Sequence, residues 1–255
     1  DSDGARCFEC GRYDHSVSEL MAIAFDAAAS VDGGTSNPAT LSTLTIAAGS
    51  DRYLLVGVSY YDASGEPRTV SGVTWNSVAM SLVKSQRVGA GTTTDIWGLV
   101  APDTGAHDAV VTFTGAVRNA VHAMSLTGVD QSTPTGTAAS ATGTSNALTV
   151  DVTSAANELV YDVATQRNGD GNTLTVGAGQ TQRTNTLGGA GAGSNSVVGA
   201  SSTEAGAASV TMSWTGTSGD EWTTCAVPVK PVAVAATHIA VNLAQSPQWQ
   251  TLVSM

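Results

Sequence analysis

The sequence predicts an all-β protein, an antiparallel two-sheet sandwich with a jelly-roll-like strand order, and three observations support this prediction. Segments of strand length follow one another along the chain with scarcely any helical periodicity. Turn-forming glycine, with 28 residues, and small hydroxyl side chains are abundant between and within these segments. The chain also repeats, since residues 41–63 return as 146–168 and residues 95–115 return as 196–216. We therefore expect two sequence-similar half-units.

The first half-unit, at about 41–129, has one strand that stands out from the others. Residues 53–61 read YLLVGVSYY, a nearly continuous apolar run of the kind expected for a central strand buried on both faces. The turn-forming residues 62–67 end this strand. The other strands expected here cover residues 41–46, 69–88 (two strands), 95–100, 107–114 and 119–126.

The second half-unit, at about 146–231, follows a polar link over residues 128–146. Its glycine-rich residues 187–195 lack the Lys-Ser/Thr pair of a phosphate-binding loop, so nucleotide binding is not indicated. We favour one interleaved sandwich domain over residues 22–231, with two separate cores as the alternative. The strands expected in this half-unit cover residues 148–152, 158–166, 174–183, 196–202, 208–214 and 222–229.

Both ends of the chain lack the regular strand pattern. Residues 1–21 are expected to form an N-terminal arm, either a tail, a segment that docks on a neighbouring subunit, or sequence upstream of a start at Met21. Residues 232–255 form an apolar C-terminal arm, which should pack on its own domain or on a neighbouring subunit. The assembly contacts expected in the two arms are Tyr13, Ile239, Leu243, Trp249 and Leu252.

The three cysteines are compatible with several chemical states. Cys7 and Cys10 form a C-x-x-C pair, for which we favour plain thiols. A local disulfide is one alternative, and a zinc site that recruits His15 is another, because structural zinc needs four ligands. Cys225 lies in the last strand and is expected to be a small buried apolar residue.

The charge balance argues against several classes of partner. Only 12% of the residues are charged, and the formal net charge is −11. Such a surface repels phosphate backbones, so no nucleic-acid partner is expected. No apolar run approaches the roughly 20 residues that span a membrane as a helix. A low-charge, hydroxyl-rich chain is typical of an extracellular protein or a virion surface.

Four segments resemble a poorly characterised β-sandwich module of bacterial secreted or surface proteins and phage structural proteins. They are VTWNSVAM (73–80), DIWGLVAPDTG (95–105), VVTFTG (110–115) and MSLTGVDQSTP (124–134). The resemblance covers about residues 25–231. It implies a location outside the cytoplasm and a role in surface display, adhesion or particle architecture, and it transfers no catalytic residue.

The sequence offers weak candidates for a metal site or a catalytic site. Asn168, Asp170 and Asn172 alternate with glycine like the start of a calcium loop, although the same pattern forms a hairpin turn. We favour the turn and expect no cofactor. A catalytic triad centred on His122 is not expected, because no G-x-S-x-G motif is present. The adjacent Asp220 and Glu221 would point to opposite faces of a strand.

Aromatic side chains could form a sugar-binding platform. The candidates are Tyr60, Tyr61, Trp97 and Trp222, with Trp75 and Trp214 as further members. Most of these residues alternate with core residues, so packing is favoured over exposure for each of them.

Taken at this level, the sequence predicts a non-enzymatic structural or decoration protein of an extracellular assembly. A phage virion, either capsid or tail, is the first candidate, and a bacterial surface filament or layer is the second. The expected partners are other copies of the chain and neighbouring structural proteins of the particle. The alternative is a lectin-like carbohydrate-binding module that recognises surface glycans.

Overall fold

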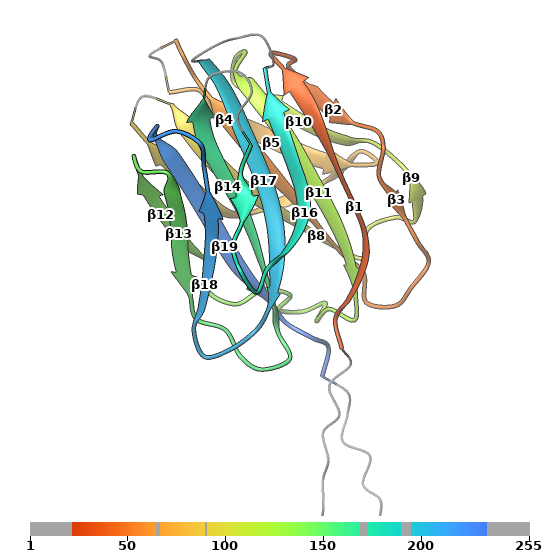
Figure 1. Cartoon of the computed structure of the whole chain (residues 1–255). Coiled ribbons are helices and arrows are strands. Elements are labelled where there is room, and N and C mark those ends of the chain that lie inside the picture. The colour runs from red at the N-terminus through yellow and green to blue at the C-terminus, as the bar shows by residue number, and fades with distance from the viewer. Residues whose placement is uncertain (1–21, 65–66, 90, 169–172, 190–194, 234–255) are drawn as a thin grey trace, which may run out of the picture. The chain divides into compact units, whose positions relative to one another are not determined.

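The computed structural model describes residues 22–64, 67–89, 91–168, 173–189 and 195–233 of the 255-residue chain (Figure 1). The strands among them belong to one compact unit, residues 21–232. The described residues form β-strands and contain no α-helix, which confirms the all-β antiparallel sandwich. The arm residues Tyr13, Ile239, Leu243, Trp249 and Leu252, together with Cys7, Cys10 and His15, lie outside the described residues.

The first half-unit begins at β1 (Ala24–Gly34), before residue 41 where the sequence placed its start, just as the second begins at β12 (Ala139–Gly143), before residue 146. It forms two facing sheets and a small strand pair. Its inner sheet contains, in order across the sheet, β1 (Ala24–Gly34), β11 (Arg118–Thr127), β4 (Tyr53–Tyr61), β8 (Thr92–Val100) and β7 (Ser81–Val88). Its outer sheet contains β2 (Ala39–Leu41), β10 (Ala109–Phe113), β5 (Val70–Trp75) and β6 (Val78–Ala79). The separate pair is β3 (Thr45–Ile46) with β9 (Gly105–Ala106).

The second half-unit repeats this plan. Its inner sheet contains, in order, β12 (Ala139–Gly143), β19 (Trp222–Val229), β14 (Leu159–Asn168), β17 (Ser196–Ala205) and β16 (Thr181–Gly188). Its outer sheet contains β13 (Ala147–Val152), β18 (Val210–Thr215) and β15 (Thr175–Val176). Neighbouring strands of both inner sheets are antiparallel.

The two half-units therefore share one strand order. Strands β1, β11, β4, β8 and β7 correspond in position to β12, β19, β14, β17 and β16, and β2, β10 and β5 correspond to β13, β18 and β15. In each half-unit the chain crosses repeatedly from the inner to the outer sheet, as Greek-key connections do. The sequence repeat is thus a repeat of folded units.

The two half-units lie in one compact unit, but unlike the interleaved arrangement that we favoured, they do not share a sheet. Every sheet takes its strands from one half-unit, so the four large sheets stack as outer, inner, inner, outer. One apolar cluster fills the first sandwich, a second lies between the inner sheets, and two further clusters fill the second sandwich. The central strands are buried on both faces because each inner sheet is covered by a sheet on either side.

The inner sheets face one another with pseudo-two-fold symmetry. Strand β1 packs on β16 and β7 packs on β12, while β11 packs on β17, β8 on β19 and β4 on β14. The contacts are reciprocal. β1 packs on the strand equivalent to β7, and β7 packs on the strand equivalent to β1, as in an isologous dimer interface. Gly57 and Ser59 of β4 approach Val163 and Thr165 of β14 in the same order, so the axis runs along the strands. Equivalent loops of the two half-units consequently lie at the same end (Figure 1).

Candidate functional site: the interface between the half-units and its open seam

The end of the interface that is nearer Ala22 and Val232 is apolar. Tyr53 and Leu55 of β4, Met124 of β11 and Val227 of β19 belong to one buried cluster there. Burying apolar surface stabilises the folded state by roughly 25 cal/mol per Å². This cluster therefore supplies the hydrophobic free energy that holds the half-units together.

The other part of the interface contains a chain of buried hydroxyl groups. The Thr94 hydroxyl donates a hydrogen bond to the Thr165 hydroxyl at 2.6 Å, and that hydroxyl donates to Ser59 at 2.7 Å. The Thr223 hydroxyl lies 2.6 Å from the Thr94 hydroxyl. Ser59 and Thr165 occupy equivalent positions, so the pseudo-two-fold axis passes between their side chains. Buried hydroxyl groups need partners, and here the partner always belongs to the other half-unit.

His122 is a fully buried titratable group in this interface. Its Nδ1 lies 2.9 Å from the hydroxyl of Thr184, which lies 2.6 Å from the hydroxyl of Ser201. Burial lowers the pKa of His122 to about 3, because the charged imidazolium would lose its hydration. A Cβ at Gly199 would lie only 2.4 Å from His122 Nε2, so the absence of a side chain there makes room for the ring.

The structure does not bring His122 together with Asp95 or Asp108. The His122 ring faces the second half-unit, whereas Asp95 on β8 accepts a hydrogen bond from Tyr60, which packs in the first sandwich. Asp108 is exposed in the turn before β10. Burial raises the pKa of Asp95 to about 6, although hydrogen bonds from the side chains of Ser85 and Tyr60 oppose the shift.

Asp162 is a second buried carboxyl group, inside the second sandwich. Trp214 Nε1 donates to its Oδ2 at 2.7 Å, and the Ser202 amide and hydroxyl contact its Oδ1 at 2.9 and 2.6 Å. Burial raises the pKa of Asp162 to about 7, although these hydrogen bonds oppose the shift. The group ties the outer strand β18 to the inner strands β14 and β17.

Two arginine side chains lie close to Asp62, which directly follows the last residue of β4. Arg68 and Arg87 each place a nitrogen 3.9 Å from an Asp62 carboxylate oxygen. Burial opposes ionisation of Asp62, but hydrogen bonds from Ser64 and from the Arg68 amide hold its pKa below the usual value. The guanidinium of Arg167 lies over the Tyr61 ring at 4.7 Å. These contacts fix the ends of β4 and β7.

The aromatic side chains that could have formed a sugar platform pack inside the protein. Tyr60, Tyr61 and Trp222 are buried, as are Trp75 and Trp214, and Trp97 is half-buried against the first core. Tyr60 meets Phe113 edge-on with ring centroids 5.5 Å apart. Stacking on a sugar requires an exposed ring face, so the four predicted platform residues do not form such a surface.

The weak calcium candidate falls largely outside the described residues. Asn168 is the last residue of β14, and Asp170 and Asn172 are not among the described residues. Within the part of the chain that the structure describes, no group of three His, Cys, Asp or Glu side chains is placed to hold a metal ion.

The inner sheets meet at two lateral edges, which we call seams. The closed seam joins β1 to β16, where the Arg183 guanidinium lies over the Phe25 ring at 4.1 Å. The Ser30 hydroxyl lies 2.5 Å from the Thr186 hydroxyl further along the same seam. Side chains from both half-units thus contact one another along this edge, although the Phe25 side chain remains 43% exposed.

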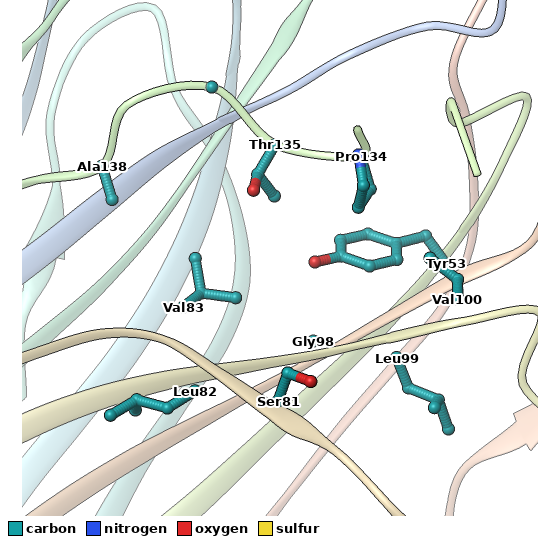
Figure 2. A pocket seen from close by; sticks show the side chains of 11 residues that line it. Tyr53, Ser81, Leu82, Val83, Gly98, Leu99, Val100, Pro134, Thr135 and Ala138 are labelled. Carbon is teal, nitrogen blue, oxygen red and sulfur yellow. The ribbon is translucent and has the colours of Figure 1, made fainter. Parts of the chain in front are cut away.

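The open seam joins β7 to β12, and it contains a groove of about 380 Å³. Figure 2 shows Val83 and Thr135 pointing toward one another across this space, with the Tyr53 ring beside Pro134. Two apolar side chains at its rim are exposed to solvent, Leu82 by 52% and Val100 by 40%. The complete lining is Tyr53, Ser81, Leu82, Val83, Gly98, Leu99, Val100, Pro134, Thr135, Gly136 and Ala138.

Strand register explains why one seam is closed and the other is open. On the closed seam, Phe25 pairs with Leu126, and Leu126 pairs with the first residue of β4. On the open seam, Thr135 pairs with Val229, and Val229 pairs with the first residue of β14, the strand equivalent to β4. Thr135 therefore occupies the position in the open seam that is equivalent to the position of Phe25 in the closed seam.

The partner of Phe25 is replaced as well. Arg183 and Val83 are the residues skipped by the register shifts of β16 and β7, so Val83 stands where the closed seam has Arg183. The groove is the space that a phenyl ring and a guanidinium fill on the opposite edge. The sequence analysis missed these residues, because only the register across four sheets brings 81–83 and 134–138 together.

Comparison with known proteins adds no family to this description. Among the described residues, no helix is long and apolar enough to cross a membrane. A scan against protein-family models, a search of curated proteins and a search of solved structures each gave no match.

Proposed function

We propose that the protein is a non-enzymatic structural component of an extracellular assembly and that it acts by self-association. The observation that carries this proposal is the open seam, where an apolar groove and the exposed Leu82 and Val100 lie at the edge of the stack. Exposed apolar grooves with this composition are typical of contact surfaces between proteins. At the equivalent place on the closed seam, Phe25 and Arg183 contact one another.

The position of the chain ends supports the same proposal. The Val232 amide donates to the Gly128 carbonyl at 2.9 Å, and a Cβ at Gly128 would lie 2.7 Å from the Ala22 carbonyl oxygen. Both arms therefore leave the fold beside one residue, at one end of the strands. The loops around Asp62 lie at the other end (Figure 1). A module joined to its neighbours by the arms would present those loops outward.

The first candidate assembly is a phage virion, in which the protein would decorate a capsid or tail beside other structural proteins. A bacterial surface filament or layer is the second candidate. Both follow from the resemblance of residues 25–231 to a surface module and from the low-charge, hydroxyl-rich composition. Binding to surface glycans is the alternative function, and the buried aromatic rings give it no platform within the described residues.

The direct test is the solution mass of the full-length chain, measured by light scattering at concentrations from about 1 to 100 μM, where weak and strong protein association both become visible. Electron micrographs of the same sample would show whether the association is regular. A closed oligomer or an array supports the proposal. A monomer of 25.6 kDa at every concentration contradicts it. Melting temperatures with and without a panel of sugars would then test the glycan alternative.

A further inference from the structure

We propose that the contact between the two half-units is sensitive to acid, so that protonation of His122 separates the inner sheets while each sandwich stays folded. The buried ionisable groups are distributed in a way that favours this response. A histidine lies in the interface, and carboxyl groups lie inside the two sandwiches. Such a contact would respond to acid whether or not the protein self-associates, so this role lies beyond the proposed function.

The site of His122 offers no partner for a positive charge. The ring is fully buried, and its Nε2 has no hydrogen-bond partner among the described residues. Its Nδ1 lies 2.9 Å from the neutral hydroxyl of Thr184. No described carboxylate lies within 4.0 Å of the ring. A buried charge without a counter-charge is strongly unfavourable, so protonation favours a form in which the ring reaches water.

The strands packed against β11 do not bring a counter-charge to this place. Ser30 on β1 and Gly57 on β4 pair with His122. Asp32 lies two residues beyond Ser30, and its Oδ1 accepts a hydrogen bond from the Gly189 amide at 2.7 Å. The ionisable side chains directed to the interface from these strands are Asp32, Tyr53, Tyr61 and Arg183, with Arg118 on β11 itself and Tyr161 on the facing β14. Asp32 is the one carboxyl group among them.

Each sandwich contains a buried carboxyl group that responds in the opposite sense. Asp95 accepts a hydrogen bond from Tyr60 inside the first sandwich, and Asp162 accepts one from Trp214 inside the second. Both groups point away from the interface, so they stay buried when the inner sheets separate. Burial raises the pKa of Asp95 to about 6 and that of Asp162 to about 7, above the ordinary 3.8. Acid therefore neutralises both carboxylates in the folded state and stabilises the sandwiches.

The interface loses stability over the same range of pH. Burial lowers the pKa of His122 to about 3 from its ordinary 6.5, so an opened form binds the proton first. Between these two values, each pH unit of acid raises the ratio of opened to closed protein by about tenfold. Hydrogen bonds lower the pKa of Asp62 and Asp130, which therefore lose their stabilising contribution only below 3.8. Acid between pH 6 and 4 thus weakens the interface and spares the sandwiches.

Cys225 reports the opening directly. Its side chain is buried between the half-units, with the sulfur 3.5 Å from the Thr94 carbonyl oxygen. The next residue, Ala226, is also buried but belongs to an apolar cluster inside the second sandwich. Successive residues of a strand point to opposite faces. Thiols at positions 225 and 226 therefore distinguish separation of the sheets from unfolding of a sandwich.

The test measures thiol protection between pH 6 and 4, as the ratio of the labelling rate in concentrated urea to the rate in native buffer. The reagent is 4,4′-dithiodipyridine, which reacts with thiols in acid. Full-length chains with Cys7→Ser and Cys10→Ser keep Cys225 as the single thiol, and the matched chain adds Cys225→Ala and Ala226→Cys. Protection of Cys225 should fall about 70-fold across this range. Protection of the thiol introduced by Ala226→Cys should not fall.

Substitution assigns the effect to His122. In the chain that reports through Cys225, His122→Gln should remove the dependence on pH. His107→Gln is the control and should retain it, because His107 packs edge-on against Trp75 outside the interface. Thermal melting of every variant checks that it is folded. The comparison of positions 225 and 226 needs no substitution at His122, so it decides the matter even if that variant does not fold.

Three results would overturn the inference. A parallel fall at positions 225 and 226 would mean that acid unfolds a sandwich rather than separating the half-units. Constant protection at position 225 would mean that the interface does not respond to acid. A fall that persists in His122→Gln would assign the response to another group. None of these results bears on the proposed function, which the solution mass tests separately.

Discussion

The imidazole of His122 lies in the space that Gly199 leaves open on the facing sheet, with its Nε2 2.4 Å from where a Cβ at Gly199 would be. The equivalent contact on the other side of the pseudo-two-fold axis pairs Cys225 with Thr94, whose carbonyl oxygen lies 3.5 Å from the Cys225 sulfur. The two half-units therefore have the same strand order but different side chains at equivalent interface positions. A large residue faces glycine on one side, and two residues of medium size meet on the other.

Gly199→Ala should destabilise the protein by about 1–3 kcal/mol, because the added methyl group overlaps His122 and Ser59 in a packed interface. Urea denaturation measures the change in the free energy of unfolding. Gly72→Ala is the control, since a Cβ at Gly72 meets no atom within 4 Å, and its effect should stay within about 0.5 kcal/mol. Combining Gly199→Ala with His122→Ala should cost less than the sum of the two. Equal stability of the two glycine variants would contradict the close packing described here.

His122 should make stability fall as the pH falls from about 6.5 toward 3. Its pKa in the folded protein is about 3, below the ordinary value of 6.5, so the unfolded chain takes up the proton first. The loss should be about 1.4 kcal/mol per pH unit within that window. Asp162 and Asp95 act in the opposite direction, because their folded pKa values are raised to about 7 and about 6.

Comparison of the wild type with His122→Gln isolates the histidine from these carboxyl groups. The stability difference between the two proteins, taken from urea titrations between pH 4 and 7, should shift in favour of the variant as the pH falls. Parallel curves for the two proteins would show that His122 titrates normally in the fold.

Thr94→Val should cost about 1–3 kcal/mol, because it removes the hydroxyl at the middle of the chain from Ser59 to Thr223 while keeping the side-chain volume. The hydroxyl of Thr223 would lose its side-chain partner in a buried site. Thr112→Val on the exposed face of β10 provides the control and should change the melting temperature little. If both substitutions have equal effects, the hydroxyl chain contributes no specific stability.

Trp214→Phe should destabilise the protein more than Trp75→Phe. Both substitutions remove a buried indole N–H and a similar area of ring. Trp214 donates to the buried Asp162 carboxyl group, whereas Trp75 donates to the Asp103 backbone carbonyl at 3.1 Å. Hydrogen bonds to charged groups contribute about 1.5–3 kcal/mol, and bonds to neutral groups about half as much. Chemical denaturation of the two variants at pH 8 measures the difference, and a reversed order would contradict the role assigned to Asp162.

The sequence predicted the long apolar strands, but residues 41–46 and 174–183, each expected as one strand, are divided between two strands in the structure, and two strands of small or polar residues were missed. Residues 53–61 and 222–229 were expected as strands and are β4 and β19. The edge strands β1 and β12 were not expected, because AFDAAASVDGG and ASATG contain mostly small or polar residues and lack alternation. Both are held by pairing with β11 and β19 rather than by their own pattern. This is a tertiary effect that local propensity does not contain.

The candidate site was less predictable than the fold for a related reason. The aromatic residues were correctly favoured as packing residues, since Tyr60 and Trp222 alternate with core positions and are buried. The groove depends on Thr135 and Val83 being small at positions where Phe25 and Arg183 are large. That comparison can be made only after the register of both half-units is known, because a one-residue slip would reverse which face each side chain takes.

The covalent link between the half-units changes how this interface can evolve. In a dimer of two identical chains, one mutation changes both symmetry-related residues. A larger side chain near the axis must therefore fit at both positions. In this protein each codon alters one side only. His122 could therefore become bulky without a second bulky residue appearing opposite Thr94, and one seam could lose its ring while the other kept it. The repeated half-units give the molecule a symmetric frame in which each contact can change independently of its counterpart.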